Sequence, residues 1–129
     1  YTYSGHPVGA AAALAAIVET RRLDVVSNAA ARGTQLYDGM VSLAGQYPVV
    51  GDVRGGHGLM TAMELVADRE TKAPIDGKLA IKMQKAAYQA GALIRVSGPN
   101  VILSPSLVIE EADIEIALNA VEEGLKAIS

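Results

Sequence analysis

The chain opens with the polar and aromatic stretch Tyr1-Thr2-Tyr3-Ser4-Gly5-His6-Pro7, which an alanine-rich run follows at once. Chain ends usually fray through small polar residues, so two tyrosines, a threonine and a histidine ahead of a helix indicate a binding site. Pro7 favours the first turn of that helix, because the N–H that proline lacks has no partner there. Thr2 and Ser4 therefore precede a helix N-terminus, whose free N–H groups attract anions such as phosphate. Ordinary capping of the helix by Ser4 or His6 is the alternative. We interpret the stretch as one half of a site.

The apolar run from Val8 to Val18 predicts a buried helix, because a helix that is apolar all round is buried. It is shorter than the roughly 18 residues of a membrane span, and no basic segment of the signal-peptide kind precedes it. Arg21 and Arg22 suit the negative end of its dipole. We expect residues 1–22 to comprise an interface motif between domains, followed by this buried helix.

Composition narrows the classes of function. The chain has 129 residues, half of them hydrophobic, which favours one globular domain. Its net charge of −3 and its lack of a basic stripe argue against binding to nucleic acid. It has no cysteine, which excludes disulfides and thiolate metal sites. Neither His6 nor His57 has a second ligand at metal-binding spacing. We expect a cytoplasmic protein with no metal, no membrane and no nucleic-acid partner.

The rest of the pattern alternates between helices and pairs of short strands. The expected elements are a helix that begins after Asp24, strands at 49–54 and 59–66, a surface loop at 67–77, a helix at 78–90, strands at 92–96 and 101–104, and a helix at 110–128. Each strand pair surrounds a glycine-containing turn and predicts a hairpin. The fold class is therefore α+β, with a small, mostly antiparallel sheet of two hairpins covered by helices and preceded by the long alanine-rich helix.

Arg95 is the most informative charged residue, because it lies in the apolar segment 92–96. If Leu93 faces the core, period-two alternation turns Arg95 the same way. A buried or cleft arginine needs a partner, and its planar fork suits a carboxylate. The alternative is an arginine that faces solvent on the open side of the sheet. Arg54, by contrast, is expected to be structural and to pair with Asp52.

None of the five lysines is a convincing nucleophile. A lysine that forms a Schiff base needs a desolvated environment that lowers its pKa. The five lie in a polar loop or on charged helix faces: Lys72, Lys78, Lys82, Lys85 and Lys126.

Residues 1–8, with the alanines after them, resemble a motif of the class III, omega-type aminotransferases, which are fold type I enzymes that depend on pyridoxal phosphate (PLP). Gly51-Asp52-Val53-Arg54-Gly55, Gly58-Leu59-Met60 and Glu64-Leu65-Val66 then resemble the hairpin of the family's small domain. Ile94-Arg95, Ile102-Leu103-Ser104-Pro105 and Leu107-Val108-Ile109 resemble its later hairpin. The Gly-Gly-His-Gly turn is one residue longer than the common form, and Ser106 replaces a frequent second proline, which leaves the subfamily open.

This resemblance implies that residues 23–129 are the small C-terminal domain of such an enzyme, with the large catalytic domain absent. It implies that Thr2 binds the PLP phosphate of the neighbouring subunit in a homodimer and that Tyr1 lies at the same interface. It also implies that Arg95 binds the substrate carboxylate.

The resemblance assigns no catalytic residue to the chain, since the family's Schiff-base lysine belongs upstream of Tyr1. The expected function is amino transfer from an amine or amino acid to a keto acid by the complete enzyme, with this fragment inactive alone. Two alternatives are a non-catalytic α+β module that oligomerises through its alanine-rich helix, and a different fold type I PLP enzyme such as a racemase, decarboxylase or aminomutase.

Overall fold

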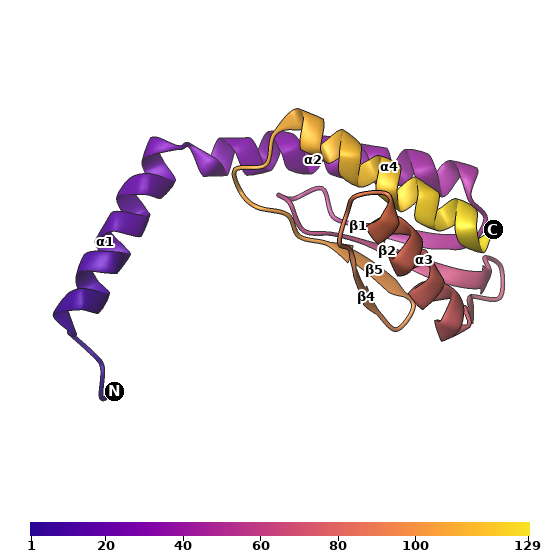
Figure 1. Cartoon of the computed structure of the whole chain (residues 1–129), viewed down its shortest axis with the longest axis horizontal. Coiled ribbons are helices and arrows are strands. Elements are labelled where there is room, and N and C mark those ends of the chain that lie inside the picture. Colours follow the sequence, from indigo (N-terminus) through magenta and orange to yellow (C-terminus); the bar gives the residue numbers. More distant parts are fainter.

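The structure is a computed structural model that describes all 129 residues. Its elements are α1 (Pro7–Arg22), α2 (Val25–Gln46), β1 (Val50–Arg54), β2 (Thr61–Asp68), β3 (Ala73–Pro74), α3 (Gly77–Gln89), β4 (Arg95–Ser97), β5 (Asn100–Leu103) and α4 (Glu111–Ile128). Helices α2, α3 and α4 and the sheet form one body, from which α1 projects as an arm (Figure 1). The predicted α+β class and the order of helices and paired strands are confirmed.

The two predicted hairpins are joined into one antiparallel sheet. Its strand order is β1-β2-β5-β4, with the short β3 on β2. The central β2–β5 ladder pairs Thr61 with Leu103 and Ala62 with Ile102, and Ile102 also pairs with Arg95 on β4. Residues directly opposite one another in an antiparallel pair point to the same face, so Ala62, Ile102 and Arg95 share one side of the sheet.

The strand boundaries shift from those predicted: β2 runs from Thr61 to Asp68 instead of over 59–66, and two further differences have a local explanation. The strand expected from Ala92 begins only at Arg95, because the carbonyl of Ile94 accepts a hydrogen bond from the Gln84 side chain at 2.8 Å instead of from a neighbouring strand. The loop expected at 67–77 contains β3, and the buried Ile75 follows it. A single apolar residue in a polar segment gave too weak a pattern to predict that strand.

Helices cover only one face of the sheet. On that face the fully buried Met63 and Val101 pack against a core to which α2, α3 and α4 all contribute. The largest buried side chains of these helices are Leu36, Met40, Met83, Ile114 and Leu125. Burying a side chain of this size stabilises the fold by about 1.5–3 kcal/mol. The core therefore lies between the helices and one side of the sheet, and the other side stays open.

A buried glycine in α2 lets the loop between β1 and β2 approach that helix. A Cβ atom on Gly33 would lie 2.3 Å from the carbonyl oxygen of Gly58, closer than atoms can pack. Gly58 itself has a positive φ of 82°, which favours glycine. This contact fixes the loop that leads into Met60 and the start of β2.

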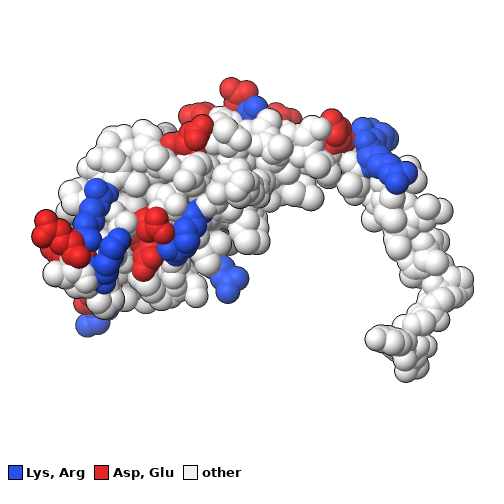
Figure 2. Space-filling model, turned by 180° about the vertical axis from the view of Figure 1, so that it is seen from behind, with Lys and Arg blue, Asp and Glu red and all other residues white.

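Helix α1 forms where it was predicted, but no residue of it is buried within this chain, so its burial at an interface stays a prediction. The helix meets α2 at Asp24, whose φ of 46° is left-handed and whose carboxylate accepts a hydrogen bond from Ser27. Figure 2 shows that charged side chains lie on the body and around this joint, whereas most of the arm is uncharged. None of the helices is long and apolar enough to cross a membrane.

Candidate functional site

Two arginines project from the open face of the sheet, and only one of them is paired. Arg54 on β1 contacts Asp52 at 2.9 Å, Glu64 at 2.8 Å and the side-chain oxygen of Asn100 at 2.7 Å. The hydrogen bond to Glu64 is the main cause that raises the pKa of Arg54 above its ordinary value. Because its donors are already engaged by these partners, Arg54 has the structural role that the sequence indicated.

Arg95 is the other arginine, and its guanidinium has neither an ion pair nor a hydrogen bond in this chain. It is exposed at the start of β4, beside Leu93, whose side chain is 81% exposed. The condition that Leu93 faces the core is therefore not met. The buried residue between them is Ile94, and alternation about Ile94 turns both neighbours outward. Of the two predicted orientations, the open face is the correct one.

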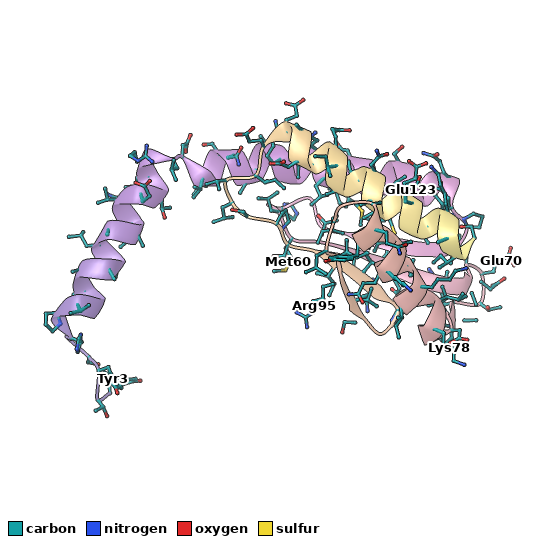
Figure 3. All side chains as sticks on the ribbon, viewed as in Figure 1. Tyr3, Met60, Glu70, Lys78, Arg95 and Glu123 are labelled. Atoms are coloured by element: carbon teal, nitrogen blue, oxygen red, sulfur yellow. The ribbon has the colours of Figure 1, made fainter.

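Arg95 lies in the wall of an apolar cleft of about 570 Å³. Nine of the twelve residues in its wall are hydrophobic, and they include Met60, Leu93 and Pro105. Figure 3 shows the Met60 and Arg95 side chains close together at the open side of the sheet. A cation that is free of protein partners, in a mostly apolar wall, is suited to bind a carboxylate.

The N-terminal stretch carries the second candidate set. Thr2, Ser4 and the residues around them are exposed, and neither hydroxyl makes a hydrogen bond. The backbone N–H groups of Ser4 and His6 are used in turns, to Tyr1 and Tyr3, whereas those of Val8 and Gly9 in the first turn of α1 have no partner. Neither Ser4 nor His6 caps the helix through its side chain. The two hydroxyls and the free N–H groups are donors of the kind that a phosphate requires.

The two candidate sets do not meet in this chain. Tyr3 lies at the far end of the arm, and Arg95 lies on the body (Figure 3). A single site that used both sets would therefore require the N-terminal stretch of one chain to lie against the body of a second chain, or α1 to adopt a different position relative to its own body.

All five lysines are exposed. Lys126 contacts Glu123 at 2.9 Å and Glu122 at 3.2 Å. These hydrogen bonds, chiefly the one to Glu123, raise the pKa of Lys126 well above its ordinary value. A nucleophilic lysine requires the opposite shift, so Lys126 lacks the environment of one.

Met60 also lines the cleft, although the sequence indicated it only as part of a strand and a family motif and not as a site residue. It follows the glycine-rich turn and precedes the buried Thr61 in β2, yet 69% of its side chain is exposed. A large apolar residue at the edge of a strand was the available signal, although such residues are common on protein surfaces.

Residues 1–125 match the family model described as aminotransferase class-III. The chain belongs to the class III aminotransferases. It is 36% identical over 134 residues to a taurine–pyruvate aminotransferase of Bilophila wadsworthia, an alignment that covers 98% of this chain and 29% of that protein. It is 33% identical to a leucine/methionine racemase of Thermococcus litoralis, over 97% of this chain and 28% of the racemase.

Solved structures agree with this assignment. An amine transaminase from an uncultivated Pseudomonas species, in its PLP-bound form, is 38% identical and superimposes with a TM-score of 0.92 over 100% of this chain and 29% of that one. The class III chain described here thus spans under a third of the length of the relatives that it matches. The resemblance seen in the three sequence motifs is confirmed, and the small α+β body matches part of a fold type I transaminase.

Proposed function

We propose that the full-length protein is a PLP-dependent aminotransferase that transfers an amino group from an amine or amino acid to a keto acid. The observation that carries this proposal is the unpaired guanidinium of Arg95 beside an apolar cleft, in a chain that belongs to the class III family. The proposal includes a homodimer and a cytoplasmic location.

The N-terminal residues fit the cofactor through the chemistry of their donors. Thr2 presents a free hydroxyl, and the first turn of α1 presents free N–H groups and the positive end of the helix dipole. PLP supplies the electron sink for amino-group chemistry when it is bound, and the protein supplies binding and orientation. We assign Thr2 to the cofactor phosphate of the partner subunit, with Tyr1 beside it. Thr2 and Arg95 lie far apart within one chain. We therefore propose that Thr2 of one subunit and Arg95 of the other contribute to the same site in the dimer.

Arg95 orients the substrate. Its planar fork can donate two parallel hydrogen bonds to a carboxylate, which fixes both the position and the direction of the bound acid. The lysine that bonds to the cofactor is proposed to come from the part of the relatives that this chain does not span, since every lysine here is exposed.

Substitutions in the full-length enzyme test both assignments. Arg95→Ala is expected to raise the KM for a keto acid about 100-fold, because a bidentate charged contact is lost, with a much smaller effect on an amine that has no carboxylate. The KM of Arg95→Lys for the keto acid should lie between the values of the wild type and Arg95→Ala, because lysine keeps the charge but loses the planar fork. Thr2→Ala is expected to weaken PLP binding, measured by spectroscopic titration of the apoenzyme, while Thr2→Ser retains it. An unchanged KM in Arg95→Ala would contradict the assignment of Arg95.

The racemase relative favours one second candidate, a PLP enzyme that interconverts amino acid enantiomers. Incubation of one enantiomer with enzyme and PLP, but without a keto acid, separates the two functions. Without a keto acid, an aminotransferase converts only about one equivalent of the amino acid per bound PLP into the corresponding keto acid and then stops, whereas a racemase produces the other enantiomer with continued turnover. The non-catalytic module predicted as an alternative would do neither.

A further inference from the structure

Arg95 is the only charged residue in the wall of its cleft. Two large apolar residues of this wall come from separate parts of the chain: Met60 precedes β2, and Leu93 precedes β4. Both are large, apolar and more than two-thirds exposed. Large apolar side chains that remain in water beside a free cation are suited to contact a ligand with a charged end and an apolar body.

Both side chains are held in place by buried neighbours. Met60 lies between the loop packed on Gly33 and the fully buried Thr61, which pairs with Leu103. Leu93 precedes the buried Ile94, whose carbonyl is bound by Gln84. The wall of the cleft is thus attached to rigid parts of the body, as a selective site requires.

We propose that Met60 and Leu93 are specificity-determining residues that restrict the Arg95 cleft to acids with one carboxylate and an uncharged, apolar body. This inference rests on the proposed function. Arg95 satisfies one carboxylate, and the part of the cleft wall that this chain forms offers no cation for a second. A second carboxylate would lose its water against Met60 and Leu93 without gaining a partner, which is unfavourable. Selection therefore operates by rejection of a second charge as well as by attraction of the first.

The test compares two inhibitors of equal chain length, hexanoate and hexanedioate, which differ in one terminal carboxylate. Each is measured as a competitive inhibitor of the full-length holoenzyme against its amino acid substrate. The inhibition constant of hexanedioate is expected to exceed that of hexanoate by about tenfold or more. Met60→Lys and Leu93→Lys each place a cation in the wall and should reduce this ratio to near one, mainly by tighter binding of hexanedioate.

Two control variants isolate the effect. Met60→Leu keeps the wall apolar and should keep the ratio. Ile81→Lys adds the same charge on α3, at an exposed residue outside the cleft, and should also keep it. The proposal is overturned if hexanedioate binds as well as hexanoate, or if Ile81→Lys changes the ratio as much as Met60→Lys does. Absence of amino transfer with every donor and acceptor would instead count against the proposed function.

Discussion

Arg69 lies just beyond β2. Its guanidinium donates hydrogen bonds to backbone carbonyl groups in the last turn of helix α2 and in the segment that follows it. It donates to the carbonyl oxygen of Val50 at 2.6 Å, to that of Tyr47 at 3.1 Å and to that of Ala44. A cation at a helix C-terminus also interacts favourably with the helix dipole. Arg69→Ala is therefore expected to destabilise the chain by about 1–2 kcal/mol, toward the low end for charged hydrogen bonds because the site is partly exposed. Urea unfolding measures this, and an unchanged midpoint would contradict it.

At the same scale, the sequence could identify Arg95 but not its orientation. Alternation shows that Leu93 and Arg95 share a face, yet it cannot say which face, because apolar residues stand at every position from Ala92 to Ile94. The buried residue is Ile94, and its choice depends on packing against helices that are distant in sequence. Met60 was missed for a related reason, since its place beside Arg95 arises only when β2 and β4 both pair with β5.

Within α2, one glycine is required by packing and another is not. Gly33→Ala gains about 1 kcal/mol of helix propensity, but its Cβ would overlap the backbone of Gly58, which cannot move as a flexible side chain does. Such overpacking costs about 1–3 kcal/mol, and it also displaces the loop that positions Met60. We expect Gly33→Ala to lower the melting temperature and to change inhibitor selectivity in the full-length enzyme.

The matched control lies in the same helix. A Cβ on Gly45 would meet no atom within 4 Å, so Gly45→Ala should stabilise the chain slightly through helix propensity alone. Differential scanning calorimetry of both variants separates the two effects. The interpretation fails if the two substitutions shift the melting temperature in the same direction.

The elements themselves were largely predictable, because each has a strong local signal. Helix α4 begins where Glu110 and Asp113 form a reciprocal capping box. Helix α3 begins where the Asp76 side chain accepts a hydrogen bond from the backbone N–H of Lys78. Apart from a two-residue shift of β2, the exceptions were the late start of β4 and the two-residue β3. Both are set by a side-chain hydrogen bond or a single buried residue, which produce no periodic pattern.

For the whole molecule, the sequence predicted one buried helix, but it could not say what buries it. An alanine-rich, uncharged run carries the same pattern whether its partner is the same domain, another domain or another chain. In this chain the partner is not the body, since α1 projects from it and touches it only at the joint (Figure 1). We propose that the burial is completed in the full-length dimer.

If this proposal is correct, α1 is less stable in the 129-residue chain than in the full-length dimer. A helix of 16 residues without tertiary contacts is marginal in water, so the amide protons of α1 in the 129-residue chain should exchange with solvent within seconds. In the full-length enzyme the same amides should be protected to the level of α2, because the apolar surface of Leu14, Ile17 and Val18 is then covered. Hydrogen exchange measured by mass spectrometry compares the two contexts.

Deletion of residues 1–22 from the 129-residue chain is the control, and it should leave the melting temperature of the body within about 2 °C. Strong protection of α1 in the 129-residue chain would show that the arm folds back onto the body or onto a second copy, and rapid exchange in the full-length enzyme would contradict its burial there.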